Sequence, residues 1–73
     1  MSIRRYDPLV VSGRLKNLRK EKGITQKELS TKTGISLSSI KQYELGKRIP
    51  EMWYLGTLAK FFNVPKDYIL GIT

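Results

Sequence analysis

The 73-residue sequence predicts an all-α fold of five short helices around one small core. Three observations support this prediction. Apolar residues recur three and four positions apart along much of the chain, which is the spacing of an amphipathic helix. Serine, threonine or proline precedes several of these segments and glycine follows them, as expected at helix ends. No segment alternates apolar and polar residues in the way that is typical of a strand.

The composition narrows the range of functions. Fourteen lysine and arginine residues against six acidic residues give a formal net charge of +8. Such an excess favours a polyanionic partner, which is DNA, RNA or an anionic membrane surface; a basic protein that is merely soluble is the alternative. No apolar segment is long enough to span a membrane and no signal peptide is visible. We therefore expect a soluble cytoplasmic, nucleoid-associated protein without membrane contact.

The sequence contains neither cysteine nor histidine. Disulfides and thiolate metal sites are therefore excluded, and the commonest metal ligand and general base is missing. The six acidic residues mostly stand where they would cap helices or form ion pairs. We predict no metal, no cofactor and no enzyme activity.

An extended N-terminal arm is predicted over residues 1–11, followed by a folded domain over residues 12–73. Pro8 and the lack of helical periodicity favour an extended lead-in. Two interpretations of the arm stay open. In the first, Arg4 and Arg5 enter a minor groove or contact phosphates, as basic arms of some DNA-binding domains do. In the second, the arm covers the edge of the core with Tyr6, Leu9 and Val10.

The first helix is expected to begin after Ser12 and to end at Gly23. Val11, Leu15 and Leu18 follow the i, i+4, i+7 rule and predict a buried stripe. Charged residues surround this stripe, as is usual on a solvated helix face. Here, however, almost all of them are basic.

The second helix is predicted over residues 26–33. Thr25 and Glu28 form a capping box, in which each side chain bonds a free backbone N–H group of the other residue. Leu29 is expected to face inward. Gly34 ends the helix, because glycine adopts the left-handed conformation without steric cost.

A third helix is predicted over residues 37–45, with Ser36 as its N-cap and Gly46 after its end. Ile40 and Tyr43 have the spacing of an inward face. Two helices joined by a tight turn within about twenty residues form a helix-turn-helix arrangement. A basic chain that contains this arrangement is a candidate DNA-binding protein.

Two further helices complete the prediction. The fourth is expected over residues 52–63, with Gly56 at a close contact to a neighbouring helix. Its expected buried residues are Met52, Leu55, Leu58, Ala59 and Phe62. The last helix should begin with Pro65 at its first position and end at Gly71.

These residues resemble the phage repressor and Cro type of helix-turn-helix domain, also called the XRE family. The resemblance covers about residues 12–71, and spaced segments that agree over most of a chain are a specific signal. The matching segments are Leu15-x-x-Leu18-Arg19, Gly23-Ile24-Thr25-Gln26, Glu28-Leu29, Gly34-Ile35-Ser36, Ile40, Glu44-x-Gly46-Lys47-Arg48-x-Pro50, Leu55, Leu58-Ala59 and Val64. The resemblance implies a compact five-helix bundle of the lambda-repressor-like type.

The sequence departs from the family pattern at three places. Ser30 replaces a common alanine, and we expect its hydroxyl to bond back to the carbonyl of Gln26. Glu51 stands where serine or threonine would cap the fourth helix, although its charge suits a helix N-terminus. Trp53 and Tyr54 replace polar residues.

The resemblance implies that the third helix lies in the major groove of double-stranded DNA. Its expected base contacts are Leu37, Ser38, Lys41 and Gln42. Gln42 is the best candidate for base readout, because its amide matches the N7 and N6 atoms of adenine. The phosphate contacts are expected from the second helix N-terminus and the basic loop, through Gln26, Ser36, Ser39, Lys47 and Arg48.

Arg19 and Glu44 resemble the family's internal ion pair, with an ordinary exposed pair as the alternative. One recognition helix covers only about four or five base pairs, so a homodimer on two half-sites is expected. In relatives the dimer contact often lies near the last loop and helix, which suggests Phe61, Pro65, Lys66 and Tyr68, with Trp53 either joining it or shielding the core.

Two classes of function compete for this fold. The leading prediction is a sequence-specific transcriptional regulator, most often a repressor that occupies a pseudo-palindromic operator. The alternative is an antitoxin-like interaction protein that uses the same fold, which the aromatic residues Trp53 and Tyr54 favour.

Overall fold

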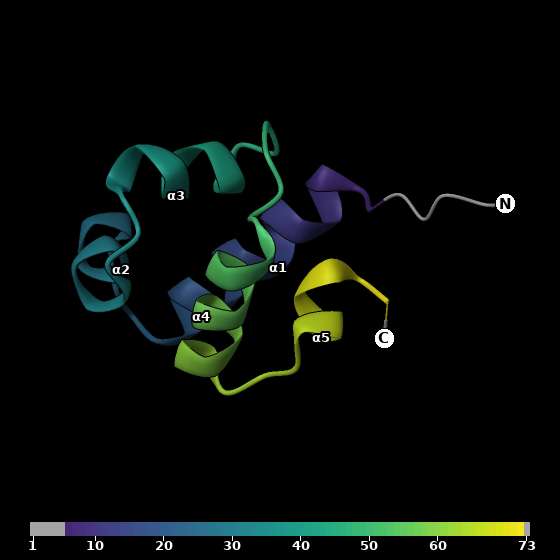
Figure 1. Cartoon of the computed structure of the whole chain (residues 1–73). Coiled ribbons are helices and arrows are strands. Elements are labelled where there is room, and N and C mark those ends of the chain that lie inside the picture. The colour runs from purple at the N-terminus through teal and green to yellow at the C-terminus, as the bar shows by residue number, and fades with distance from the viewer. Residues whose placement is uncertain (1–5, 73) are drawn as a thin grey trace, which may run out of the picture.

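The computed structural model describes residues 6–72, and they form five α-helices without a strand among them (Figure 1). The predicted all-α fold is confirmed. The helices are α1 (Pro8–Glu21), α2 (Gln26–Thr33), α3 (Leu37–Glu44), α4 (Met52–Phe62) and α5 (Lys66–Leu70). Arg4 and Arg5 lie outside the described residues.

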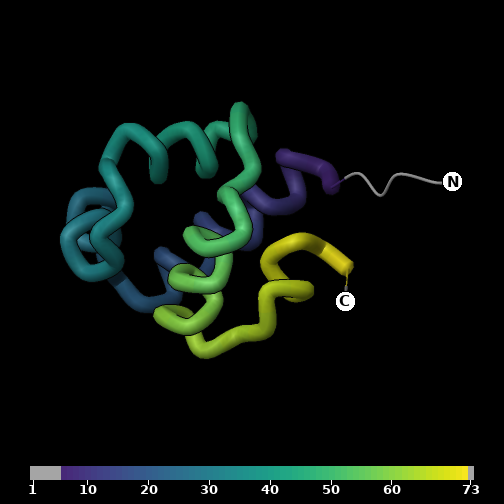
Figure 2. Tube along the Cα trace, viewed as in Figure 1, coloured from purple at the N-terminus to yellow at the C-terminus, as the bar shows by residue number. Residues whose placement is uncertain are grey.

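The helix α1 packs against α3 and α5, α2 packs against α3 and α4, and α4 also packs against α5. Figure 2 follows the chain through this arrangement and shows α3 along one edge of the molecule. The two ends of the described chain lie on the side opposite α2 (Figure 1). Both ends are close in space, because a Cβ atom added at Gly71 would lie 2.6 Å from Cγ1 of Val10.

The core consists of the apolar faces of all five helices together with Ile35 from the turn between α2 and α3. Its most buried members are Val11, Leu15, Leu29, Ile35, Ile40, Tyr43, Leu55, Leu58 and Ile69. The stripes predicted for α1 and α4 are therefore largely confirmed. Met52 is the exception, because 68% of its surface is exposed. Ile49 packs against the core and Pro50 is buried just before α4 begins. The apolar spacing of α4 therefore extends one turn beyond the core, which leaves Met52 exposed.

The start of α1 differs from the prediction. Asp7 is its N-cap and accepts a hydrogen bond from the backbone N–H of Leu9 at 2.9 Å. Pro8 occupies the first helical turn, where its missing N–H group has no consequence. The extended lead-in is therefore wrong from Pro8 onward, and the cap predicted at Ser12 is wrong. The hydroxyl of Ser12 is buried and donates to the backbone carbonyl of Glu44 at 2.6 Å.

This contact of Ser12 has a structural purpose. The last carbonyl groups of a helix have no partner within the helix, and Glu44 is the last residue of α3. Ser12 supplies the missing partner from α1 and so attaches the end of α3 to the centre of the fold.

Pro65 also differs slightly from its expected position, because it is the N-cap of α5 rather than its first residue.

Candidate nucleic-acid interface

The helix-turn-helix consists of α2, the turn at residues 34–36 and α3. The bounds predicted for α2 are confirmed, and so is the capping box: Thr25 N donates to Glu28 Oε1 at 2.8 Å and Glu28 N donates to Thr25 Oγ1 at 3.0 Å. The bonds from the backbone N–H and then the hydroxyl of Thr25 hold the pKa of Glu28 below its usual value. Gly34 follows with φ +77°, as its left-handed turn requires.

Side chains also fix the turn. The hydroxyl of Ser30 donates to the carbonyl of Ile35 at 2.5 Å, so the expected bond to the carbonyl of Gln26 is wrong. Ser30 reaches forward across the turn because the left-handed conformation of Gly34 reverses the chain and brings the carbonyl of Ile35 close to it. Ser36 then caps α3 by accepting from the backbone N–H of Ser39 at 3.1 Å.

The orientation of α3 is set by its buried side. Ile40 and Tyr43 are each 1% exposed and Glu44 is 3% exposed. None of the four residues predicted to contact bases is buried: Ser38 and Lys41 are exposed, while Leu37 and Gln42 are half-buried. The helix therefore presents a polar face away from the core, with one leucine at its start.

A network around the Glu44 carboxylate connects three helices. Arg19 of α1 forms two bonds to it, from Nε to Oε2 at 2.7 Å and from Nη2 to Oε1 at 2.9 Å. Gln26 of α2 donates its amide Nε2 to Oε1 at 3.1 Å. Arg19 also donates Nη1 to the carbonyl of Ile24 at 2.9 Å. The bond to Glu44 raises the pKa of Arg19, so the guanidinium stays charged.

The burial of this network decides between the two interpretations of the Arg19–Glu44 pair. The Arg19 side chain is only 13% exposed and the Glu44 side chain 3% exposed, so the ion pair is internal. Gln26, which was predicted to hold a phosphate, uses one amide bond to orient itself on Glu44. Its amide keeps a second N–H group and the carbonyl oxygen for another partner.

The remaining predicted phosphate contacts lie in two groups. Ser36 and Ser39 stand at the N-terminus of α3, where the hydroxyl of Ser36 donates to Ser39 Oγ at 3.0 Å. Lys47 and Arg48 are exposed in the loop after α3. Arg48 is ion-paired there, because its Nη2 lies 2.5 Å from Oε1 of Glu51.

The sequence interpretation missed Glu51 as part of this surface. Its side chain makes no cap on α4, and it turns back to Arg48 instead. The signal that could have revealed this pair is the opposite charge three residues apart, an interval at which side chains meet in a helical turn. In a loop before a helix, that interval alone does not predict a contact.

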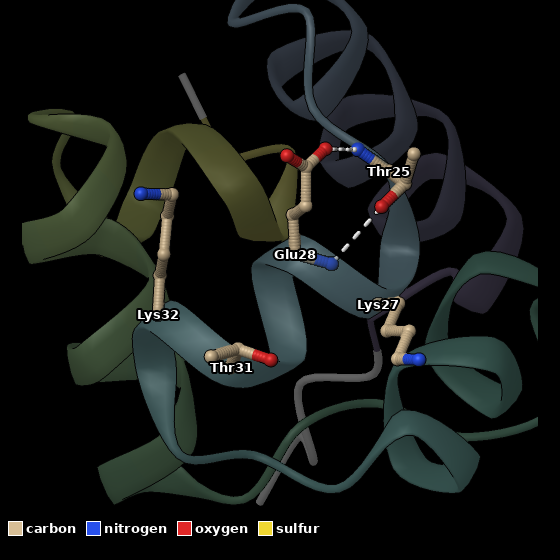
Figure 3. A pocket seen from close by; sticks show the side chains of 5 residues that line it. All are labelled: Thr25, Lys27, Glu28, Thr31 and Lys32. Atoms are coloured by element: carbon tan, nitrogen blue, oxygen red, sulfur yellow. Dashed lines mark hydrogen bonds between the residues drawn. The ribbon is translucent and has the colours of Figure 1, made fainter.

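A shallow hollow lies on the outer side of α2, lined by Thr25, Lys27, Glu28, Thr31 and Lys32 (Figure 3). Figure 3 shows Lys27 and Lys32 pointing in different directions and Glu28 turned back to Thr25. The polar groups therefore do not converge on one point. Within residues 6–72 no acidic cluster suits a metal ion, and no helix is long and apolar enough to cross a bilayer.

The residues predicted for a dimer contact differ in how far the chain itself covers them. The Phe61 ring lies 5.2 Å from Nζ of Lys22, and the Tyr68 ring lies 4.4 Å from the guanidinium of Arg14. Pro65 and Lys66 are exposed. Trp53 is 75% exposed, and its neighbour Met52 is also largely exposed.

Comparison with known proteins identifies the family. The sequence model of the family HTH_3, described as helix-turn-helix, matches residues 15–69. The chain belongs to this helix-turn-helix family. The predicted XRE-type resemblance is therefore confirmed.

The relatives of this helix-turn-helix chain are regulators. It is 42% identical over 60 residues to the uncharacterised HTH-type transcriptional regulator YobD of Bacillus subtilis, covering 82% of this chain and 54% of that protein. It is 36% identical over 61 residues to the cryptic phage CTXphi transcriptional repressor RstR of Vibrio cholerae, covering 84% and 54%. The chain thus spans about half the length of these relatives. That they are transcriptional regulators supports the prediction that it is not an enzyme.

Among solved structures, the restriction-modification controller protein C.AhdI from Aeromonas hydrophila has the same arrangement of helices. Its TM-score is 0.78 at 25% identity, with 86% of this chain and 96% of that chain covered.

Proposed function

We propose that this chain binds double-stranded DNA sequence-specifically and represses transcription by occupying a pseudo-palindromic operator. The observation that carries the proposal is the mounting of α3. Its inner side is fixed by the internal Arg19–Glu44 pair, while its outer side presents Leu37, Ser38, Lys41 and Gln42. A helix of eight residues held in this way fits a major groove, where each base pair has a distinct pattern of donors and acceptors.

Each outer residue has a proposed role. Gln42 reads adenine through its amide, Leu37 contacts a thymine methyl group, and Ser38 and Lys41 reach bases or phosphates. Phosphate binding comes from Gln26 at the start of α2 and from residues at both ends of α3, which are Ser36, Ser39 and Lys47. The net charge of +8 supplies the long-range attraction.

Selection of bound sequences from random duplex DNA tests this proposal directly, and the recovered motif should have two-fold symmetry. On the selected duplex, Gln42→Ala should cost about 1–3 kcal/mol of binding free energy and relax the preference at one base pair, whereas Lys47→Ala should weaken binding to all sequences about equally. Fluorescence anisotropy titrations against single-base variants of the duplex measure both effects. An equal loss on every duplex for Gln42→Ala would refute its role as a reader.

Salt dependence provides an independent check of DNA binding. If a dimer neutralises about eight phosphates, log Kd against log salt concentration should change with a slope of magnitude about 7. A slope near zero on the selected duplex would contradict the proposal.

Dimeric binding follows from the length of α3. Eight residues rise only about 12 Å along a helix, which covers too few base pairs for useful specificity. We propose that a second copy occupies a second half-site one helical turn away. Trp53 is the favoured contact, because it is 75% exposed, whereas the rings of Phe61 and Tyr68 each already have a cation of the same chain near them.

Trp53→Ala should weaken binding to a duplex with two half-sites by more than about 1 kcal/mol, because an exposed tryptophan is a common anchor of an interface. Binding to a duplex with one half-site should be unchanged. Leu9→Ala is the matched control, since Leu9 is 71% exposed on a different helix. Equal losses on both duplexes would place Trp53 at the DNA instead, and a loss from Tyr68→Ala alone would place the contact at α5.

A further inference from the structure

We infer that Glu51 withdraws Arg48 from the phosphate-binding cations and thereby sets the strength and salt dependence of DNA binding. This inference rests on the proposed function and changes one part of it. The sequence predicts Arg48 as a phosphate contact beside Lys47. The structure provides Arg48 with an anionic partner from its own chain.

The contacts of Glu51 occupy both of its carboxylate oxygens. Oε1 accepts from Nη2 of Arg48 at 2.5 Å, and Oε2 lies 3.4 Å from the hydroxyl of Tyr43, which donates to it. The guanidinium of Arg48 also lies 5.8 Å from the centre of the Tyr43 ring. These three side chains therefore contact one another in turn. Because Tyr43 is buried on the inner side of α3, the cluster is attached to the core at one end.

The pKa shifts of Glu51 and Tyr43 both favour these contacts at neutral pH. The backbone N–H of Glu51 itself, and then the guanidinium of Arg48, hold the pKa of the Glu51 carboxyl below its usual value. Burial of the ring, and then the negative charge of Glu51, raise the pKa of Tyr43, so its hydroxyl stays protonated and able to donate. Glu51 is thus a full negative charge facing Arg48.

The pair lies where it affects DNA binding. The loop at residues 45–51 stands beside the C-terminal end of α3, at the same edge of the molecule (Figure 1). A phosphate that approaches Arg48 there meets a nearly neutral pair and the repulsion of a carboxylate. Lys47, one position earlier, is the loop cation that stays available. Both side chains of the pair are about half exposed, so it can be altered without disturbing the core.

A double-mutant cycle tests this inference. The four proteins are the unaltered chain, Glu51→Gln, Arg48→Ala and the double variant, with Kd measured on the selected duplex between 50 and 200 mM salt. Glu51→Gln should tighten binding at 50 mM salt and steepen the log–log slope by about 0.9 for each bound copy. The affinity gained from one added phosphate contact should fall about 3.5-fold per copy as the salt concentration rises from 50 to 200 mM. Arg48→Ala alone should leave the slope of the unaltered chain almost unchanged. In the double variant, Arg48→Ala should remove the steepening that Glu51→Gln causes.

Two controls complete the design. Glu21→Gln removes another exposed acid, at the end of α1, and it should change the slope much less than Glu51→Gln. Lys47→Ala should flatten the slope by about 0.9 per copy in both backgrounds. Circular dichroism checks that every variant keeps its helices.

The outcomes separate the inference from the function on which it rests. If Arg48→Ala flattens the original slope as much as Lys47→Ala, Arg48 binds phosphate despite Glu51 and the inference is overturned. Weaker binding by folded Glu51→Gln would also overturn it, because Glu51 would then be holding the loop in a binding conformation. If no protein in the set binds DNA with salt-dependent affinity, and Lys47→Ala has no effect, the proposed function fails as well.

Discussion

Arg19→Ala is expected to lower the free energy of unfolding by about 3–5 kcal/mol, because removing one partner of an internal ion pair leaves the other charge uncompensated. Among residues 6–72, Glu44 would keep only the amide of Gln26 as a side-chain partner, and the carbonyl of Ile24 would lose its bond from Arg19. A domain of 73 residues has a total stability near the low end of the usual 5–15 kcal/mol. The variant should therefore be partly unfolded at room temperature.

Urea denaturation followed by circular dichroism measures this loss. The matched control is Arg48→Ala, which removes the same type of side chain from an exposed pair. It should cost less than about 1 kcal/mol, as exposed pairs do. Similar small losses for both variants would contradict the internal role assigned to Arg19.

Leu29→Ala is expected to cost about 2–5 kcal/mol, the range for truncating a buried leucine. Leu29 is 1% exposed and is the one buried residue of α2. It faces Leu15, Ile40 and Leu58 around the centre of the core. Its loss would therefore detach α2 in particular and loosen the helix-turn-helix while leaving α1 and α5 packed together.

Amide hydrogen exchange distinguishes this local effect from general destabilisation. Protection in α2 should fall more than protection in α1. Thr31→Ala, on the exposed side of the same helix, is the control and should change stability by no more than about 0.5 kcal/mol. Uniform loss of protection along the chain for Leu29→Ala would show that α2 does not open separately.

The parts of the fold that local chemistry determines could be predicted from the sequence. The bounds of α2 follow from the capping box at Thr25 and the left-handed glycine at Gly34, and both signals lie within a few residues of the helix end. The start of α1 was missed because two local signals conflict. Pro8 restricts the residue before it, but it is also well suited to a first helical turn, and Asp7 as cap decides between them.

Contacts between distant parts of the chain could not be predicted from spacing. Arg19 and Glu44 are 25 residues apart, and the sequence suggested their pairing only through a family resemblance. The exposure of Met52 depends on how far the core extends along α4, and the helical spacing of apolar residues does not predict that extent. Glu51 was interpreted by its place at a helix start, whereas its actual contacts depend on the path of the loop before it.

The residues that attach α3 to α1 are different from the residues on the outer side of α3. Glu44 is attached to α1 twice, through its carboxylate by Arg19 and through its backbone carbonyl by Ser12. The second attachment belongs to the main chain, so no substitution at position 44 removes its acceptor. Substitutions on the outer side, at Ser38 or Lys41 for example, leave both attachments in place. Under the proposed function, exchange of a few outer side chains would change the target sequence while the scaffold beneath them stays the same.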